Sequence, residues 1–237
     1  NKDIKDIFEK GKYEGDENLF STTKFIMQIS VRSNGVSNAH VKYEKRAHPH
    51  SKLISITNGV FVDRWQSKDL KNIPKDYSDE DYWNTKKVLR SKMISFVKEK
   101  TGISLNNDIC TLVWARRFAM YKRPYLLFSD EERIIDILSN NQYPLQIVIS
   151  GKPHESDVEG KKIMDKIIAL QNNPKIKGKI AYIKGYSIDI SEKLVKGADI
   201  WLNTPEKGKE ACGTSGMKSA LNGAVQMTIP DGWAEEV

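Results

Sequence analysis

From residue 109 to residue 232, short apolar runs alternate with segments whose apolar residues recur at helical spacing, and this alternation limits the fold more than any other feature. Each run is continuously apolar, which is typical of strands that are buried on both faces. The five runs are ICTLVWA (109–115), LQIVISG (145–151), IAYIKG (180–185), ADIWLNTP (198–205) and VQMTIPDG (225–232). The pattern predicts an α/β fold with a doubly wound parallel sheet and right-handed crossovers.

Apolar spacing also predicts the helices. Four apolar residues separated by seven, four and three positions predict an amphipathic helix that ends near Gly102. These are Tyr82, Leu89, Met93 and Phe96. Shorter helices are predicted around 134–138 and 163–170, and over 191–197 and 216–223. Upstream, FIMQISVRSNGVSNAH (25–40) is predicted to be apolar structure interrupted by a turn at Asn34-Gly35.

The charge of the chain favours anionic ligands without identifying them. Its 38 lysines and arginines exceed its 31 aspartates and glutamates, which gives a net charge of +7. The lysines are mixed with acids along the chain, so a nucleic-acid-binding tail is not indicated. Cys110 and Cys212 are too far apart for a metal knuckle, and no apolar run reaches the roughly 20 residues that span a bilayer. We expect a soluble, cytoplasmic protein that binds neither nucleic acid nor membrane.

The most specific signal is the loop EACGTSGMKSALNG (210–223), in which small residues precede a predicted helix. Such a loop lets backbone N–H groups and the helix dipole approach a phosphate group closely. The loop is not a Walker A sequence, which needs four residues between its first glycine and its Gly-Lys pair. Taken alone, the segment is also compatible with a plain glycine-rich turn whose lysine faces solvent.

A basic cluster lies in WARRFAMYKRP (114–124), directly after an apolar run. Its members are Arg116, Arg117, Lys122 and Arg123. Four cations at the end of a predicted central strand would be costly to bury without partners, so an anion is expected nearby. The alternative is a solvated charged turn that leads into a helix beginning at Pro124.

Other positions are less specific. Asn58-Gly59 is a common turn pair, although an asparagine amide there also suits a polyol. Tyr186 is compatible with an amphipathic wall residue, and Glu210 with an acid favoured by a helix dipole. The four histidines form no compact metal-binding pattern and there is no GxSxG motif, so neither a metal site nor a serine hydrolase is predicted.

Seven segments, in this order along the chain, resemble the α-glucan (glycogen, starch, maltodextrin) phosphorylase family and in particular its shorter bacterial and archaeal branch. They are SNGVSNAH (33–40), ITNGVFVDRW (56–65), WARRFAMYKRP (114–124), ISGKPHESD (149–157), GYSIDISEKLVKGADIWLNTP (185–205), EACGTSGMKSALNG (210–223) and DGW (231–233). Seven ordered matches are far more specific than any one of them.

The resemblance implies a GT-B architecture of two Rossmann-like domains with pyridoxal 5′-phosphate (PLP) at the cleft. Residues 1–57 are then expected to be the C-terminal remnant of the N-terminal domain. Residues 58–237 are expected to be the Rossmann-like, PLP-binding C-terminal domain, truncated at its end. The implied reaction is cleavage of the terminal α-1,4 bond of a glucan by orthophosphate, with release of α-glucose 1-phosphate.

The resemblance also implies roles for individual residues. Lys218 matches the lysine that forms the Schiff base with PLP. The other expected cofactor-binding residues are Gly213, Thr214, Ser215, Arg116 and Tyr186. Arg117 and Lys122 match the catalytic pair that binds the substrate phosphate. The glucosyl site is expected to be lined by Asn58, Tyr121, Glu210 and Cys212.

Three hypotheses follow. The first is a phosphorylase catalytic segment acting on α-1,4-glucan and orthophosphate, as a homodimer or with a complementing N-terminal chain. The second is a non-catalytic module that keeps the fold and binds PLP or glucan. The third is a nucleotide-sugar glycosyltransferase of the GT-B fold. The loop EACGTSGMKSALNG (210–223), here called the lysine loop, argues against it, because such enzymes need no Schiff-base lysine. Phosphate-dependent release of glucose 1-phosphate separates the first from the second, and dependence on UDP- or ADP-glucose would identify the third.

Overall fold

The computed structural model of the chain describes residues 2–13, 16–74 and 76–237. They form two compact units, and both units combine segments that are distant in the sequence. The larger unit comprises residues 59–206 and 214–229. The smaller unit comprises the described residues of 1–58 together with 207–213 and 230–237.

A five-stranded, all-parallel sheet forms the centre of the larger unit, which confirms the α/β fold predicted from the apolar runs. Its strands are β5 (Cys110–Ala115), β6 (Leu145–Gly151), β7 (Ile180–Lys184), β8 (Ile200–Asn203) and β9 (Val225–Thr228). The order across the sheet is β7-β6-β5-β8-β9, so the strand order reverses on either side of β5. The carboxyl ends of β5 and β8 therefore flank a topological switch point, where sheets of this kind bind ligands.

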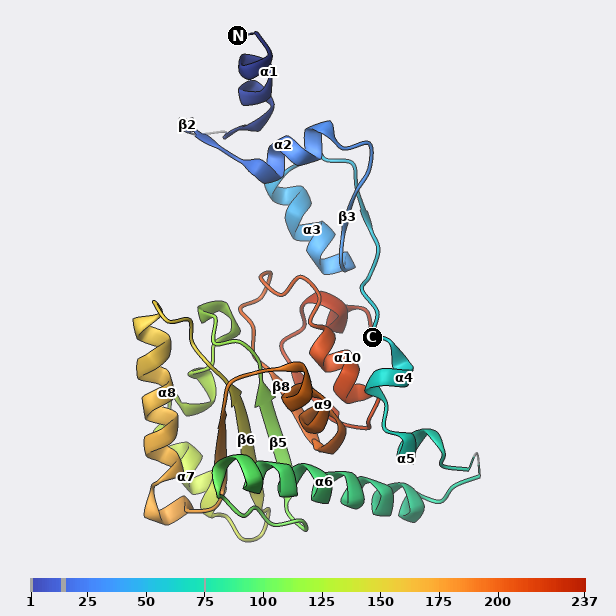
Figure 1. Ribbon diagram of the computed structural model, residues 1–237, viewed down its shortest axis with the longest axis vertical. Coiled ribbons are helices and arrows are strands. Elements are labelled where there is room, and N and C mark those ends of the chain that lie inside the picture. The colour runs from blue at the N-terminus through green and yellow to red at the C-terminus, as the bar shows by residue number, and fades with distance from the viewer. Residues whose placement is uncertain (1, 14–15, 75) are drawn as a thin grey trace. The chain divides into compact units, whose positions relative to one another are not determined.

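Helices cover both faces of this sheet (Figure 1). They are α6 (Asp79–Thr101), α7 (Glu131–Ser139), α8 (Val158–Gln171), α9 (Ile188–Gly197) and α10 (Thr214–Ala220). Shorter segments are α4 (Val62–Trp65), α5 (Lys68–Lys71) and the 3-10 helices η1 (Met120–Lys122), η2 (Leu126–Phe128) and η3 (Pro174–Ile176). Along β5, Leu112 and Trp114 join the core with α7 and α8, whereas Val113 and Ala115 join the core with α6 and α9.

The long helix α6 matches the prediction at its C-terminal end. A capping box between Ser78 and Asp81 begins the helix, and Gly102, at a φ of 74°, ends it. Between these ends, Lys86 and Arg90 are buried, with exposed fractions of 2% and 1%. Apolar spacing did not predict this burial, because charged residues ordinarily face solvent.

Two predicted helices have different bounds in the structure. α9 begins at Ile188, three residues before its predicted start, because the Ser187 hydroxyl accepts the Ile190 N–H and caps the helix. α10 begins two residues before its predicted start and ends at Ala220. Gly223, which was predicted to end it, lies beyond the helix with a φ of 73°.

The prediction that all five strands are buried on both faces is wrong for β9. Val225 and Met227 have exposed fractions of 67% and 51%. Within the described part of the chain, β9 pairs with β8 alone and forms an edge of the sheet. An apolar run therefore indicated a strand here without indicating its burial.

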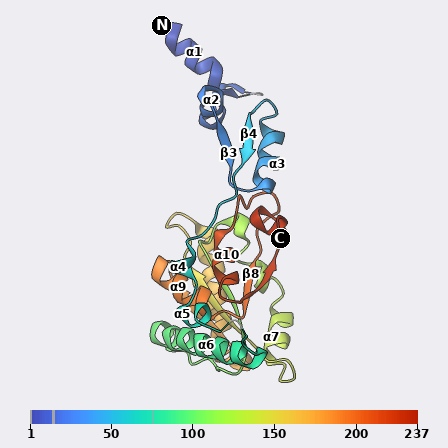
Figure 2. The same cartoon turned by 90° about the vertical axis from the view of Figure 1, so that its right-hand side faces the viewer.

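The smaller unit contains two small sheets, one antiparallel and one parallel. Its elements are α1 (Lys2–Gly11), β1 (Lys12–Tyr13), β2 (Asp16–Phe20), α2 (Thr22–Ile29), β3 (Ser33–Gly35), α3 (Asn38–Ala47), β4 (Leu53–Ser55) and the 3-10 helix η4 (Gly232–Glu235). β1 pairs with β2, and β3 lies beside β4 (Figure 2).

The turn predicted at Asn34-Gly35 is wrong, because both residues belong to β3. The glycine is needed there for close packing instead. A Cβ atom at Gly35 would lie 2.6 Å from the Val41 side chain of α3. The glycine therefore lets helix and strand approach each other, a requirement that a sequence cannot distinguish from a turn.

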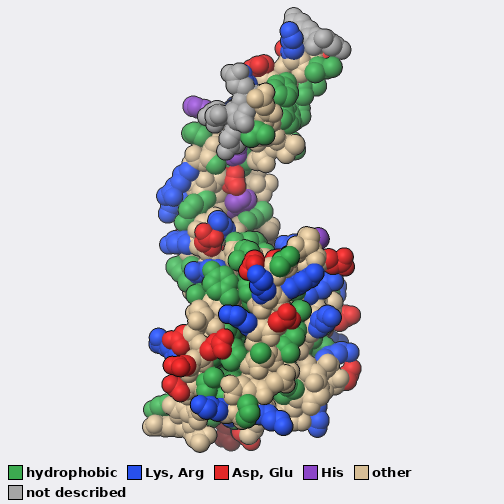
Figure 3. Space-filling view, turned by 90° about the vertical axis from the view of Figure 1, so that its left-hand side faces the viewer, with side chains coloured by type: hydrophobic (Ala, Val, Ile, Leu, Met, Phe, Trp, Pro, Cys, Tyr) green, Lys and Arg blue, Asp and Glu red, His purple; other side chains and the backbone are tan. Residues whose placement is uncertain are grey.

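Charge on the surface is mixed in sign. On the face shown in Figure 3, Lys and Arg side chains are interspersed with Asp and Glu. This agrees with the mixed charge pattern of the sequence. Among the residues that the structure describes, no helix has both the length and the apolar character needed to cross a membrane.

Candidate functional site

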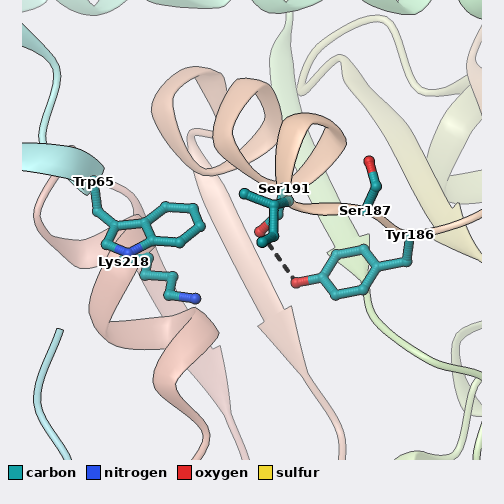
Figure 4. A pocket seen from close by; sticks show the side chains of 6 residues that line it. Trp65, Tyr186, Ser187, Ser191 and Lys218 are labelled. Carbon is teal, nitrogen blue, oxygen red and sulfur yellow. Dashed lines mark hydrogen bonds between the residues drawn. The ribbon is translucent and has the colours of Figure 1, made fainter. Parts of the chain in front are cut away.

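A cavity of about 310 Å³ lies beyond the carboxyl end of β7 in the larger unit. Its lining residues are Trp65, Tyr186, Ser187, Ile188, Ser191 and Lys218. Trp65 comes from α4 and Lys218 from α10, whereas the others follow β7 and begin α9 (Figure 4). Cavities of this size hold small organic ligands.

Lys218 brings an amine into this cavity. Its Nζ lies 3.8 Å from the centroid of the Trp65 ring, and in Figure 4 it extends from the indole toward the side on which Tyr186 lies. Burial, and after it the charge of Arg64, lowers the pKa of Lys218 from its ordinary value. The environment therefore makes the charged form of this amine less favourable than it is for a lysine in water.

The facing wall is aromatic. The Tyr186 hydroxyl lies 3.2 Å from Ser191 Oγ, the bond marked by the dashed line in Figure 4. Because Ser191 is on α9, this hydrogen bond fixes the phenol ring against the helix. The cavity thus presents aromatic side chains on two sides of a lysine amine, an arrangement that suits a planar ligand.

Two of the four cations in the basic cluster are held by β8 and the loop after it. The buried Arg116 guanidinium donates to the side chain of Asn203 and to the Leu202 carbonyl. Arg123 donates to the carbonyls of residues 204 and 205, at 2.9 Å each. These contacts link the segment after β5 to β8 across the switch point.

The other two cations have more solvent around them. Arg117 is exposed, and Lys122 is half-buried with its Nζ 4.9 Å from the centroid of the Tyr121 ring. The Tyr121 carbonyl accepts the Glu206 N–H at 2.6 Å. The basic cluster is therefore partly a structural link and partly a surface that an anion can reach.

The loop before α10 depends on a glycine. Gly213 has a φ of 87°, which residues with side chains rarely adopt, and a Cβ atom there would lie 3.1 Å from the Glu210 carboxylate. Thr214 and Ser215 form the first turn of α10 and are half-buried. Lys218 follows one turn later on the same helix.

In the smaller unit, Asp231 organises the segment that carries Glu210. Its buried carboxylate accepts the N–H groups of Gly208 at 2.7 Å, Glu210 at 3.0 Å and Gly232 at 2.9 Å. A Cβ atom at Gly232 would lie 2.3 Å from the Cys212 carbonyl oxygen. The DGW segment therefore packs directly against the Glu210 loop.

Asn58 lies beside Cys212 in the same unit. Burial raises the pKa of the Cys212 thiol, and a hydrogen bond from the Asn58 backbone opposes this more weakly. The Ser37 hydroxyl donates to the Ala211 carbonyl at 2.6 Å. The smaller unit thus brings together SNGVSNAH, the Asn58 end of ITNGVFVDRW, the start of the lysine loop and DGW.

The structure places the predicted site residues in three groups. The larger unit holds two of them. The first group is the cavity residues Tyr186 and Lys218, with Thr214 and Ser215 on the same helix as the lysine. The second group follows β5 and consists of Arg116, Arg117, Tyr121 and Lys122. The smaller unit holds Asn58, Glu210, Cys212 and Gly213.

Sequence reasoning did not single out Trp65, Arg64 or Asn222 as functional residues. Each lies within one of the seven segments, so the signal was present. Trp65 ends ITNGVFVDRW, and Asn222 is a polar residue in the otherwise small and apolar end of the lysine loop. Their roles depend on contacts between segments far apart in the sequence.

The cavity residues fit an aromatic aldehyde such as PLP. They offer one amine with a lowered pKa, flanked by an indole and a phenol, in a space sized for a small ring compound. By contrast, within residues 2–13, 16–74 and 76–237 no group of three His, Cys, Asp or Glu side chains is placed to hold a metal ion.

The fold and the cavity define an α/β protein with a lysine side chain in a cavity at the carboxyl edge of a parallel sheet. Comparison with known proteins agrees. The model of the carbohydrate phosphorylase family matches residues 23–237, and the chain belongs to this family. The resemblance found in the sequence is confirmed.

Named relatives support the same assignment. Glycogen phosphorylase from Aquifex aeolicus (strain VF5) is 29% identical, over 98% of this chain and 40% of the relative. Maltodextrin phosphorylase from Thermococcus litoralis is 30% identical, over 97% and 32%. Glycogen phosphorylase from Mycobacterium tuberculosis (strain H37Rv) is 27% identical, over 94% and 31%. The chain therefore spans less than half the length of these curated relatives.

Proposed function

We propose that the chain is the PLP-binding portion of an α-1,4-glucan phosphorylase, a glycosyltransferase of GT-B architecture. Residues 1–57 belong to the N-terminal domain in this proposal, and residues 58–237 form the Rossmann-like C-terminal domain. The proposed substrates are α-1,4-glucan and orthophosphate, and the product is α-glucose 1-phosphate. A second copy of the chain or an N-terminal chain is the proposed protein partner.

The environment of Lys218 carries the proposal. Its amine lies in a cavity next to Trp65, has a lowered pKa and belongs to the loop that matches the family. Lys218 would hold the cofactor covalently, Tyr186 would lie against its ring, and Gly213, Thr214 and Ser215 would bind its phosphate. When bound, PLP would supply a phosphate group that exchanges a proton with orthophosphate.

The basic cluster supports the phosphate-dependent part of the proposal. Two phosphate groups close together repel strongly away from bulk water, so they require several cations. Arg117 and Lys122 would bind the substrate phosphate, and Arg116 would contribute charge near the cofactor phosphate. Asn58, Tyr121, Glu210 and Cys212 would contact the glucosyl unit, with Glu210 accepting hydrogen bonds from sugar hydroxyls.

The test is to add PLP to the purified chain, reduce with borohydride and locate the phosphopyridoxyl group by peptide mass spectrometry. We expect a single adduct on Lys218, absent from Lys218→Ala and retained by Lys193→Ala, an exposed lysine on α9. Labelling scattered over many lysines would contradict the proposal.

A second measurement addresses the reaction. Glucose 1-phosphate is assayed with maltodextrin and orthophosphate, with and without a complementing N-terminal domain. Phosphate-dependent release supports a phosphorylase. An adduct on Lys218 without release under either condition would favour the non-catalytic PLP-binding module.

A further inference from the structure

Asn222 is a buried amide just beyond the end of α10, and every polar group of its side chain has a partner. Its Nδ2 donates to the carbonyls of Trp65 at 2.8 Å and Lys218 at 2.9 Å. Its Oδ1 accepts the Ser67 N–H at 2.7 Å, and its backbone carbonyl accepts a hydrogen bond from the buried amine of Lys86 at 2.8 Å. A flipped amide would place its oxygen against two carbonyls, so the side chain has one orientation.

Two of these partners line the cavity. One amide nitrogen joins the backbones of Trp65 and Lys218, and the side chains of the same two residues meet, with the amine 3.8 Å from the indole centroid. Asn222 therefore connects the backbones of α4 and α10 at Trp65 and Lys218, without lining the cavity itself.

We infer that Asn222 is a positioning residue for Lys218. By tying the two backbones together, it holds the amine against the indole ring, in the position from which it reacts with an aldehyde. A reacting group displaced by about 1 Å loses much of its effectiveness, so supporting contacts of this kind control reactivity. The inference rests on the proposed function, because the aldehyde is that of the proposed cofactor.

The chain offers a matched control in Gln146 on β6. This amide is 1% exposed, and Asn222 is 0% exposed. Gln146 Nε2 donates to the Asn106 carbonyl at 2.7 Å, and its Oε1 accepts the Asn106 N–H at 2.9 Å. Asn222→Leu and Gln146→Met thus both replace a buried, hydrogen-bonded amide by an apolar side chain of similar shape. Only the first removes contacts to Lys218 and Trp65.

Two readouts are compared with the thermal stability of each variant. The first is the yield of borohydride-trapped adduct on Lys218 at limiting PLP. The second needs no cofactor: the Lys218 amine is labelled with a trace arylating reagent across a pH series and quantified by peptide mass spectrometry. We expect Asn222→Leu to lower trapping about tenfold and to change the Lys218 labelling profile. Gln146→Met should lose comparable stability and leave both readouts unchanged.

A second pair of variants applies if Asn222→Leu does not fold. Ser67 has a φ of −65° and a ψ of 136°, which proline can adopt, and Gln66 before it has a compatible extended backbone. Ser67→Pro removes the N–H that Asn222 accepts and displaces the amide. Ser67→Ala keeps that N–H and removes the hydroxyl that caps α5. We expect only the proline variant to change the trapping yield and the labelling profile of Lys218.

The outcomes separate the two proposals. If the unmodified chain forms no adduct on Lys218, the proposed function fails, and the labelling profile still decides the role of Asn222. If Asn222→Leu, or Ser67→Pro in its place, keeps the Lys218 profile and the trapping yield of the unmodified chain, the positioning role is wrong.

Discussion

At the scale of single residues, the Trp65 ring lies close to two cations. Lys218 Nζ is 3.8 Å from its centroid, and the Arg64 guanidinium carbon is 5.6 Å from it. Two positive charges near each other repel, and loss of the lysine proton relieves that repulsion. Arg64 therefore adds to burial in lowering the pKa of Lys218. The arginine tunes the amine from outside the cavity lining.

This leads to a prediction about pH. Arg64→Gln removes the repulsion and should raise the pKa of Lys218 toward its ordinary value, so that labelling of the amine begins at higher pH. The measurement is the pH profile of Lys218 labelling. Arg133→Gln, an exposed position on α7, is the control and should leave the profile unchanged. A profile for Arg64→Gln that stays in place or moves to lower pH would contradict the role of the Arg64 charge.

At the scale of elements, α6 carries a lysine into the core. Lys86 Nζ donates to the Ala198 and Asn222 carbonyls at 2.8 Å each, and so joins α6 to the ends of α9 and α10. Burial lowers the pKa of Lys86 to about 8, against the opposing effect of the Asp199 charge. The hydrogen bonds that join α6 to α9 and α10 are thus made by an amine whose charged form is disfavoured by burial.

The free energy of unfolding should report this cost. The folded pKa lies below the ordinary value of 10.5, so between about pH 8 and 10.5 the unfolded chain holds a proton that the folded chain has lost. Raising the pH therefore stabilises the fold through Lys86, by roughly 2 to 3 kcal/mol from about pH 7 to about pH 10.

Urea unfolding of Lys86→Met isolates this contribution, because other titrating groups are shared with the unmodified chain. The stability difference between the two proteins should grow in favour of the unmodified chain as the pH rises over that range. A difference that is constant with pH would show that Lys86 keeps its proton when folded.

The same elements indicate how much the sequence could predict. Continuous apolar runs located all five strands of the sheet, and for the four strands other than β9 such runs reflect burial on both faces. The end of α6 was predicted because Gly102 supplies a left-handed cap. The burial of Lys86 and the exposure of β9 were not predictable, since both depend on what packs against the element. At the site, Tyr186 and Lys218 were predicted because their segments resemble those of the family. Asn222 was not predicted, because its contact to Trp65 joins residues far apart in the sequence.

At the scale of the whole molecule, Asp231 links two segments of the smaller unit, 207–213 and 230–237, by accepting backbone hydrogen bonds. If that unit opens independently, Asp231→Ala should speed amide hydrogen exchange in residues 207–213, where Asp231 accepts two N–H groups. Loss of about 2 kcal/mol of local stability corresponds to roughly thirtyfold faster exchange. Amides in β5 and β6 should exchange at their original rates. Faster exchange throughout the chain would show that the two units unfold together.

The backbone passes several times between the two units, and this limits where the chain can be cut into two pieces. The backbone changes unit at 58–59, 206–207, 213–214 and 229–230. A break between residues 58 and 59 would leave Ser37 on one product and Ala211, which accepts its hydroxyl, on the other. Neither product would hold a complete smaller unit. The larger unit would stay whole on the second product, whereas the smaller unit would form only if the two products associated.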